Sequence, residues 1–548
     1  MPMAHSRETL QSQQRVWLVS MSCGGVYSNA SRHRPFWYAV QVSQPTPHLQ
    51  VSLPRRRAIT AGLLLGMSLG ALVASVVSTA MPTAISTLGG LAHYSWVFSA
   101  YLLTSTASVP IWGRLSDLYG RRRMYLLGVA IFLVGSVFAG AATSMFTLIG
   151  ARAIQGLGAG AIIPMSMTIV GELYTLSERA RTQALFSGVW GVASIAGPLV
   201  GGYITDALSW RWVFYLNVPF GFCCMTVIAL AYPATRLTRQ VQVDWLGAAL
   251  LFSGISTLLI ALGGDTGSAI AWLGATVVLL GGFVVTERHA VEPILPLALV
   301  KLPVISRTIV VVFLVGIAMF GAIAFIPLFV QSVQGGTATQ AGQVLTPLFL
   351  GWVVVSIVAA RMTVRIGYRI SAITGSVLMT AGFIGLSLLD SHSSRTLLLV
   401  SCTILGAGMG TQMLSLLLAV QHGVDRSQLG LATSLNQFSR SVGAALGVAA
   451  MGAILARGLA GLSLPGGAEG ALASGAIALS GPVRDQFAAA LHRVFLAGAA
   501  VSGAGLVATM FLPPVQFTHG VPAAAGEQMI EAEMTNLNPD DEPIAISE

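Results

Sequence analysis

The chain has 548 residues, of which 54% are hydrophobic and only 9% carry a charged side chain. Soluble domains contain about 25% charged residues, so this composition excludes a soluble protein and indicates a chain that lies mostly in a membrane. The formal net charge of +9 does not indicate nucleic-acid binding. Most of the arginines lie in short segments between apolar runs, where they set the orientation of a membrane protein.

Residues 1–53 are polar and irregular and contain no long apolar segment. Two interpretations are open, a disordered N-terminal extension in the cytoplasm or a gene model that begins too early. We favour a translation start near Val51, because the arginines at 55–57 then form an ordinary cytoplasmic flank for the first membrane span. N-terminal sequencing of the native protein that found Met1 or Pro2 would contradict this start.

Fourteen apolar runs follow, each about 20 residues long, which is the length that an α-helix needs to cross a bilayer. They lie near residues 58–82, 94–112, 124–142, 146–171, 184–206, 211–232, 244–264, 269–287, 309–332, 341–360, 371–390, 396–420, 432–456 and 488–512. The 61 glycines suit close packing of helices in lipid. We therefore predict an all-α integral membrane protein with 14 transmembrane helices.

The basic residues of the loops test this count independently. Loops assigned to the cytoplasm carry 18 Lys or Arg residues, whereas loops and helix ends assigned to the outside carry five. A shift by one helix would reverse this bias, so the positive-inside rule fixes the parity. We expect a multi-pass protein of the cytoplasmic (inner) membrane with both termini in the cytoplasm.

A charged loop between the second and third runs reads Gly-Arg-Leu-Ser-Asp-Leu-Tyr-Gly-Arg-Arg over residues 113–122. Its acid can pair with an arginine or face the positive end of a neighbouring helix. A contact of either kind, made in one conformation and broken in another, would form a gate. The alternative is a loop that only fixes topology. The candidate gating residues are Gly113, Arg114, Asp117, Gly120, Arg121 and Arg122.

Arg152 lies inside the fourth apolar run. An arginine at the centre of a membrane helix costs about 2.5–3.5 kcal/mol on insertion scales and usually faces a cavity or a partner. The alternative is a side chain that extends to the membrane interface. Arg440 is a second arginine within a run, for which the interfacial position carries more weight.

The fifth run is rich in small residues around one proline. Pro198 removes a backbone hydrogen bond and is expected to kink the helix. The glycines let a neighbouring helix approach closely, and general packing of small residues is the alternative interpretation. The residues of this motif are Gly191, Gly197, Pro198, Gly201 and Gly202.

A weak internal repeat relates two parts of the chain. Residues 360–369 resemble the charged loop, with Gly367 over Gly120 and Val364 over Asp117, and residues 405–410 resemble residues 155–160. Two related halves are typical of transporters with a binding site at the membrane midplane. We predict two pseudo-repeated six-helix halves, residues 54–232 and 309–513, two additional central helices within residues 233–308, and an acidic disordered cytoplasmic tail at residues 514–548.

The sequence contains no phosphate-binding loop, metal-ligand cluster or nucleophile triad. We therefore expect no enzymatic activity, no metal and no cofactor. The expected partners are a small-molecule substrate and the lipid bilayer, and we expect a monomer.

These motifs together resemble the major facilitator superfamily, specifically its fourteen-helix drug:proton antiporters of the EmrB/QacA type, over about residues 55–513. The charged loop resembles the superfamily's loop between helices two and three. Residues 152–160 resemble the helix-four motif, whose arginine is implicated in proton coupling, and residues 188–202 resemble the helix-five motif of antiporters. Residues 210–219, Trp-Arg-Trp-Val-Phe-Tyr-Leu-Asn-Val-Pro, resemble the opening of helix six in the fourteen-helix group.

The chain departs from that family in its first span. The family often has Leu-Asp-x-Thr there, whereas this chain has Leu72-Val73-Ala74-Ser75, so that Val73 occupies the position of the acid. A membrane carboxylate at such a position helps to bind protons or cationic drugs, and none is evident here.

The resemblance implies export of small amphipathic compounds, driven by the proton gradient, through rocking of the two halves. Asp117 and its arginines would close the cytoplasmic side, Arg152 would tune the protonation of a partner group, and the helix-five glycines would form a tight hinge. A dedicated exporter of one metabolite or antibiotic is the alternative, and a membrane sensor or scaffold without transport is a third. The candidates for the substrate cavity are Met67, Met165, Met167, Trp190, Phe320 and Phe325.

Overall fold

The computed structural model describes residues 51–174, 176–233, 244–263, 266–290, 297–424, 428–459 and 481–513. These residues form α-helices with short connections, and no β-strand occurs among them. The acidic tail and all but the last three residues of the N-terminal extension lie outside the described residues.

The long helices follow the predicted apolar runs in order. The first group is α1 (Leu53–Leu88), α2 (Tyr94–Tyr119), α3 (Arg121–Gly140), α4 (Met145–Leu173), α5 (Leu176–Ala207), α6 (Trp212–Tyr215) and α7 (Asn217–Ala231). Next come α8 (Trp245–Gly263), α9 (Thr266–His289) and the short α10 (Leu297–Val300). The last group is α11 (Pro303–Ser332), α12 (Ala338–Ile366), α13 (Tyr368–Ser387), α14 (Arg395–His422), α15 (Leu429–Leu459) and α17 (Pro482–Met510).

Thirteen helical segments of the described residues are long and apolar enough to cross a membrane. The remaining predicted span is α2, a 26-residue helix whose hydropathy is lowered by seven Ser and Thr side chains. The run at 211–232 divides into α6 and α7, because Pro219 in the first turn of α7 has no N–H to continue the helix from α6. With α6 and α7 counted as one span, the predicted all-α fold with 14 helices is confirmed.

Several helices are longer than the runs that predicted them. α1 has 36 residues, against 25 in its apolar run, and α5 begins at Leu176 rather than near residue 184. A helix of this length spans about 54 Å, well beyond the roughly 30 Å hydrocarbon layer. An apolar run marks only the part of a helix that lies within the membrane. The polar turns that continue the helix into the aqueous phase are therefore not predicted from hydropathy.

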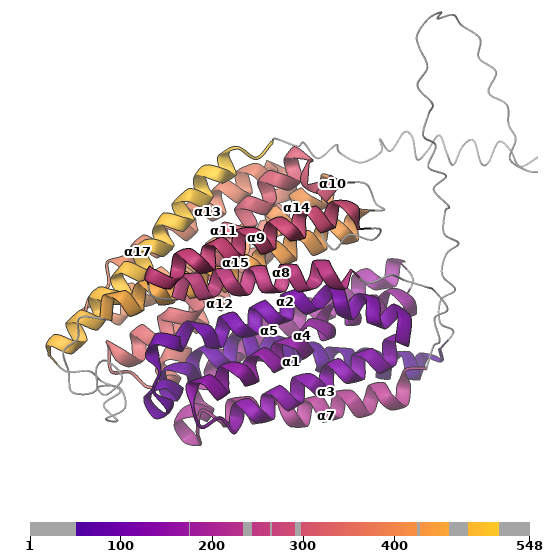
Figure 1. The fold of residues 1–548 in the computed structure, drawn as a ribbon, viewed down its shortest axis with the longest axis horizontal. Coiled ribbons are helices and arrows are strands. Elements are labelled where there is room, and N and C mark those ends of the chain that lie inside the picture. Colours follow the sequence, from indigo (N-terminus) through magenta and orange to yellow (C-terminus); the bar gives the residue numbers. More distant parts are fainter. Residues whose placement is uncertain are drawn as a thin grey trace, which may run out of the picture. The chain divides into compact units, whose positions relative to one another are not determined.

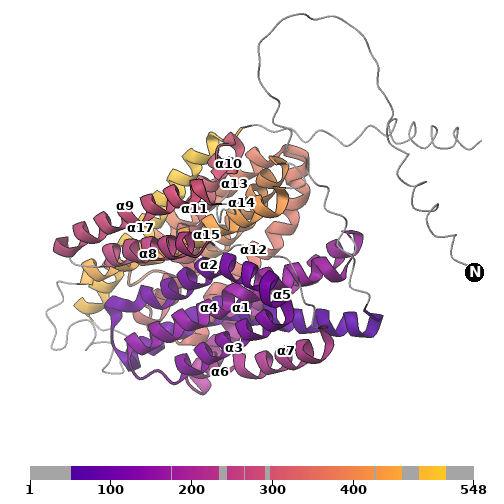
Figure 2. The same cartoon turned by 45° about the vertical axis from the view of Figure 1, so that its right-hand side comes forward.

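Two bundles of helices pack in the same way (Figures 1 and 2). In the first bundle, α4 packs on α2 and α3, and α1 packs on α5 and α7. In the second, α14 packs on α12 and α13, and α11 packs on α15 and α17. The pseudo-repeat of two six-helix halves is thereby confirmed. From here on, the N-half means α1–α7 and the C-half means α11–α17.

The glycines that the internal repeat matches in residues 155–160 and 405–410 make equivalent contacts in the two halves. A Cβ atom added at Gly156 of α4 would lie 2.5 Å from the carbonyl oxygen of Tyr101 in α2, and one at Gly406 of α14 would lie 2.0 Å from that of Leu348 in α12. Gly158 and Gly408 likewise approach the backbones of α3 and α13. Glycine is required at these crossings because any side chain would separate the helices.

Arginines hold the last helix of each half in matching ways. Arg55 Nε donates to the carbonyl oxygen of Ala231 at the end of α7 (2.6 Å), and Arg122 donates to that of Ala229. In the C-half, Arg307 donates to the carbonyl oxygen of Phe511 (2.8 Å) and Arg369 donates to that of Met510 (2.7 Å), both at the end of α17. The last carbonyls of a helix lack intrahelical donors and carry partial negative charge, so a guanidinium there is stabilising.

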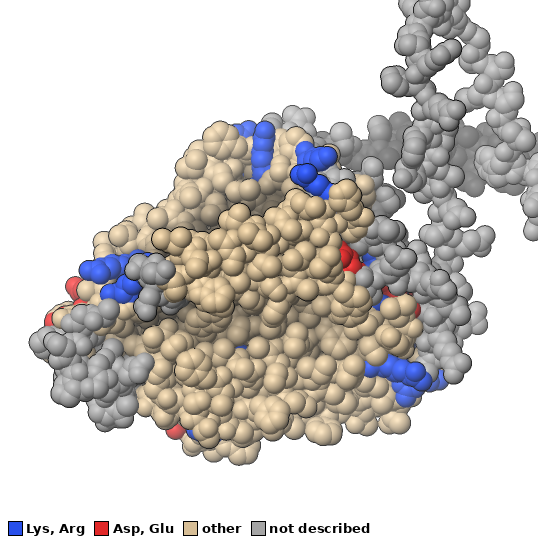
Figure 3. Space-filling view, in the orientation of Figure 1, with Lys and Arg blue, Asp and Glu red and all other residues tan. Residues whose placement is uncertain are grey.

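The two additional helices lie beside the seam between the halves. Leu251, Ile255 and Leu259 of α8 and Phe283 of α9 form an apolar cluster with Leu103 of α2 and Ala449 of α15. Most of α9 is exposed, since only 11% of its most apolar stretch is buried. Figure 3 shows charged side chains at the margins of this face and an uncharged surface between them, as expected for a surface in contact with lipid.

Candidate functional site

The charged loop between α2 and α3 is held within the N-half. Gly120 forms the turn with φ 90° and ψ 137°, a backbone conformation that L side chains rarely adopt, and Gly367 forms the equivalent turn with φ 83°. Asp117 pairs with Arg121 at 3.3 Å. Arg121 also pairs with Glu172 at the end of α4.

The other residues of the loop have separate surroundings. Arg122 caps α7, as described above, and Arg114 lies in the last turns of α2. Gly113 faces open space, because an added Cβ would meet no heavy atom within 4 Å. In this conformation the acid of the loop therefore binds an arginine of its own half and not the end of a helix in the other half.

Arg152 is buried in a neutral polar network. Its side chain is only 2% exposed, its Nε donates to the carbonyl oxygen of Val97 (3.2 Å), and its guanidinium lies 4.0 Å from the ring centre of Tyr101. Its Nη1 donates to Gln155, which in turn donates to Ser136 Oγ of α3 (2.5 Å). The cation–π contact, worth about 2 kcal/mol in a desolvated place, offsets part of the cost of burying the charge.

No carboxylate of the described residues pairs with Arg152. Sequence reasoning singled out the arginine because of its charge, but it did not identify Tyr101 or Gln155 as partners. Gln155 lies one turn along the same helix, and this spacing was the available signal.

The helix-five motif forms the junction of α5 with α1 and α12. Added Cβ atoms at Gly197 and Gly201 would lie 2.0 Å from Ser75 Oγ and 2.7 Å from Val76 of α1. One at Gly202 would lie 2.4 Å from the carbonyl oxygen of Ala338 in α12, which belongs to the C-half. The carbonyl of Pro198 faces Gly342 of α12, whereas Gly191 makes only an ordinary contact with that helix. The motif thus permits close backbone contact within the N-half and between the halves.

A carboxylate of the N-half caps a helix of the C-half. Asp206, at the end of α5, accepts hydrogen bonds from the N–H of Ala338 (3.1 Å), the N–H of Thr339 (2.8 Å) and Thr339 Oγ1 (2.5 Å). These are the first residues of α12, where backbone N–H groups lack intrahelical acceptors and the partial charge is positive. Asp206 was not among the candidate residues predicted from the sequence.

Further hydrogen bonds join the halves near the same ends of the helices. Gln331 of α11 accepts from Thr83 Oγ1 (2.9 Å) and donates to the carbonyl oxygen of Thr79 (2.8 Å), both in α1. Tyr94 and Ser99 of α2 donate to the carbonyl oxygens of Ala324 (2.5 Å) and Ala445 (2.9 Å). None of these four side chains, Gln331, Thr83, Tyr94 and Ser99, was singled out from the sequence as a contact between halves.

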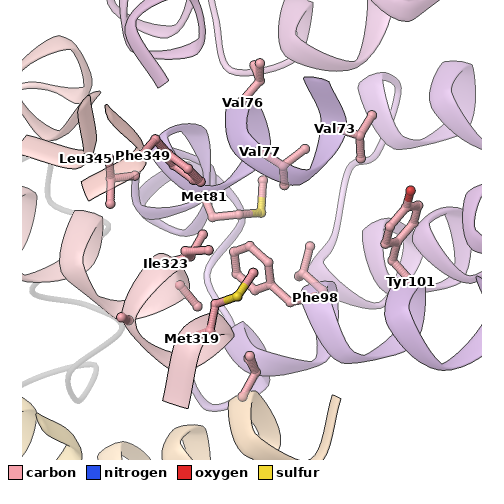
Figure 4. Close-up of a cluster of buried hydrophobic side chains, with 14 of the residues drawn as sticks. Val73, Val76, Val77, Met81, Phe98, Tyr101, Met319, Ile323, Leu345 and Phe349 are labelled. Atoms are coloured by element: carbon pink, nitrogen blue, oxygen red, sulfur yellow. The ribbon is translucent and has the colours of Figure 1, made fainter. Parts of the chain in front are cut away.

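An apolar cluster lies between the halves beside these bonds (Figure 4). Met81 of α1 and Phe98 of α2 face Met319 and Ile323 of α11. Val73 is 2% exposed and belongs to the same buried core. An aspartate at position 73 would therefore need a partner or a proton to be tolerated there.

The candidates for the substrate cavity divide into two groups. Met67, Met165 and Phe325 are at most 2% exposed, and the ring of Phe325 packs 5.5 Å from that of Tyr94. Met167, Trp190 and Phe320 are partly buried at the margin of the core. A fully enclosed side chain cannot contact a ligand in this conformation, so only the second group has an exposed surface for one.

The described residues contain no group of three or more His, Cys, Asp or Glu side chains that could hold a metal ion. The functional features of this structure are therefore a buried arginine, a charged loop and a set of contacts between two similar halves.

The sequence and the fold are similar to those of known proteins. A family model described as Major Facilitator Superfamily matches residues 63–448. The chain is 36% identical over 408 residues to the multidrug transporter protein MdtP of Bacillus subtilis, which covers 73% of this chain and 75% of that protein. It is 34% identical over 403 residues to multidrug resistance protein 3 of the same organism, covering 72% and 79%.

Solved structures with lower identity have the same fold. A bacterial homologue of the human lysosomal transporter Spinster, in an inward-facing and unoccupied conformation, aligns with a TM-score of 0.61 at 16% identity, covering 84% of this chain and 98% of that one. The nucleoside transporter NupG aligns with a TM-score of 0.59 at 12% identity, covering 84% and 99%. At these identities the likeness concerns the fold alone.

Proposed function

The chain belongs to the Major Facilitator Superfamily, and we propose that it exports small amphipathic compounds from the cytoplasm by using the proton gradient. It is a transporter and not an enzyme. The observation that carries the proposal is the similarity, over more than 70% of the chain, to two bacterial proteins named for multidrug transport and resistance. We further propose that it lies in the cytoplasmic membrane as a monomer, with both termini in the cytoplasm.

The proposed mechanism is alternating access by two bodies, residues 54–232 and 309–513, with the helices of residues 233–308 beside them. The contacts of Asp206, Gln331 and Tyr94 support a state in which the outer ends are joined. Export requires these contacts to break while contacts at the cytoplasmic ends form. Asp117, near the end of α2, pairs with Arg121 at the start of α3 and is suited to exchange that partner for one in the C-half.

Proton coupling is assigned to the region around Arg152. Its partners in this conformation are Val97, Tyr101 and Gln155, which are neutral. The group whose protonation Arg152 would tune therefore has to approach it in another state of the transport cycle.

The proposal is tested by efflux of N-phenyl-1-naphthylamine and ethidium from cells that contain the protein, with and without an uncoupler. We expect the wild type to export at least one of these dyes and the uncoupler to stop export. Asp117→Asn should lower the initial rate by about tenfold at equal expression, because the neutral amide cannot replace a charged gate contact worth about 1.5–3 kcal/mol.

Asp390→Asn is the matched control, since Asp390 is an exposed carboxylate in the connection between α13 and α14. Export that continued at full rate after collapse of the proton gradient would rule out proton coupling. Equal rates in wild type and Asp117→Asn would remove the gate role of the loop.

Asp206→Asn tests the proposed closure of the outer side. We expect the outer ends to separate more often, because the amide lacks the negative charge and one of the two acceptor oxygens that hold α12. A cysteine at Ile323, in a background without other cysteines, should react about fivefold faster with a membrane-impermeant maleimide, corresponding to roughly 1 kcal/mol for one such contact. The control is Asp485→Asn, a carboxylate that binds Ser391 within the C-half. Unchanged labelling would show that Asp206 does not stabilise the closed outer side.

A dedicated exporter of one metabolite or antibiotic is the second candidate function. The observation that favours it is Val73, which packs in an apolar core where the similar drug antiporters often have an acid. Transport of a single class of compound across a broad panel would support this function, whereas transport of chemically unrelated dyes would contradict it.

A further inference from the structure

Arg440 is a second cation within a membrane helix, and its environment differs from that of Arg152. It lies about three turns into α15 and is partly exposed. Its Nη1 is 3.0 Å from Met413 Sδ of α14, and its Nη2 donates to Gln437 Oε1, one turn earlier in the same helix. Arg152 is enclosed by its partners, whereas the Arg440 residue is partly exposed.

The neighbours of α15 define the direction of this side chain. Gly443 and Gly447 contact the backbone of α11, and Phe438 and Leu446 pack toward the cluster of α8 and α9. Arg440 lies on the same face as Gly443 and Gly447, where its carbonyl oxygen approaches Gly316 of α11, and its side chain extends to Met413 of α14. The guanidinium is therefore on the side of α15 that faces α11 and α14, away from the face covered by α8.

The internal repeat shows that the scaffold does not require a cation here. Gly443 and Gly447 approach α11 as Gly197 and Gly201 approach α1, and this register places Ser194 at the position equivalent to Arg440. Ser194 is neutral and buried in α5. The same packing is thus built with a small neutral residue in the N-half, so the charge of Arg440 requires a separate explanation.

No protein carboxylate compensates this charge among the described residues. Their acids lie at or near helix ends or in connections: Asp117, Glu172, Glu178, Asp206, Asp244, Glu287, Asp390 and Asp485. The ion pairs of the described residues involve Arg56 and Arg121 and not Arg440. A guanidinium remains charged in proteins, so an anion that arrives with the transported compound would find a donor already in place.

We propose that Arg440, assisted by Gln437, binds an anionic group, a carboxylate or a sulfonate, on the compound that this protein transports. The planar guanidinium offers two parallel donors to such a group. Met413, beside it, supplies an adaptable apolar surface for the rest of an amphipathic molecule. This inference rests on the proposed export function and specifies the charge class of its substrates.

The test compares two dyes that share their aromatic rings. 1-Anilinonaphthalene-8-sulfonate is an anion, and N-phenyl-1-naphthylamine is its neutral counterpart. Transport of each dye is measured in proteoliposomes that contain the wild type, Arg440→Gln or Arg440→Lys. Arg457→Gln is the control, because Arg457 is an exposed arginine near the end of the same helix. We expect Arg440→Gln to raise the KM for the sulfonate by about tenfold, the loss of one charge-assisted contact, and to leave the KM for the neutral dye within about twofold. Arg440→Lys should restore part of the difference.

Binding measured without transport keeps the two proposals separate. The sulfonate should raise the unfolding temperature of the purified wild type more than that of Arg440→Gln, at matched dye concentration. Equal changes in KM for both dyes, or a sulfonate shift that is the same in both variants, would overturn the role of Arg440. If the wild type moves the neutral dye but not the sulfonate, export stands and the anion site is rejected. If the sulfonate shift depends on Arg440 while no dye is moved, the site stands and the export proposal fails for these compounds.

Discussion

Gly202→Val is expected to stop export while the protein still folds. The glycine lies one turn before Asp206, and a Cβ there would be 2.4 Å from the carbonyl oxygen of Ala338 and 2.7 Å from Cα of Thr339. Both atoms belong to the backbone of α12, so they cannot rotate away as the end of a side chain would. Overpacking of this kind costs about 1–3 kcal/mol.

The cost applies only to the state in which α5 and α12 are in contact. A penalty of about 1–3 kcal/mol on one state changes the ratio of two conformations by about 5–150-fold. The variant should therefore accumulate with its outer ends apart, and the initial rate of dye efflux should fall by about tenfold or more.

Gly188→Val is the matched control on the same helix. A Cβ at Gly188 meets no heavy atom within 4 Å, so the valine should cost little and leave efflux near the wild-type rate. Labelling of a cysteine at Ile323 by an impermeant maleimide should rise in Gly202→Val and not in Gly188→Val. Full activity of Gly202→Val at normal expression would show that the contact of α5 with α12 is not part of the transport cycle.

The helices and the repeat could be predicted because both depend on local properties. A run of apolar residues must form a helix in lipid, where every backbone hydrogen bond has to be made internally. Gly406 could be matched to Gly156 because each lies where two helix backbones cross too closely for a Cβ atom. Both halves therefore need a glycine at this position, and the need is visible in the sequence. The exact ends were not predictable, since α1 continues for several turns beyond its apolar part.

The contacts between the halves could not be predicted in the same way. Asp206 and Thr339 are 133 residues apart in the chain, and neither has an unusual neighbour that would reveal the pairing. Their meeting depends on the packing of α5 against α12 and on the conformation of the transporter. Gln331 gave no signal either, because a glutamine at the end of an apolar run is unremarkable until α1 is known to lie beside it. Motifs therefore identified the helices of the candidate site, whereas the geometry supplied the partners.

Arg152→Gln is expected to abolish export that depends on the proton gradient. Glutamine loses the charge, the bond to the carbonyl oxygen of Val97 and the contact with the ring of Tyr101. If Arg152 tunes the protonation of a partner group, its removal should lower the initial rate of uncoupler-sensitive efflux by about tenfold or more. Arg152→Lys should also be impaired, because a point charge cannot make the planar contact over Tyr101 and donate to Val97 and Gln155 together.

Two further variants separate coupling from folding. Tyr101→Phe keeps the ring that faces Arg152 and should retain most activity, whereas Tyr101→Leu should be impaired like Arg152→Gln. Arg123→Gln is the control for loss of an arginine, since Arg123 is exposed at the start of α3.

The decisive measurement is movement of the dye down its own concentration gradient in proteoliposomes without a proton gradient. A coupling role predicts that Arg152→Gln still performs this downhill movement, whereas loss of both downhill and driven transport at normal expression would assign Arg152 to the architecture of the N-half.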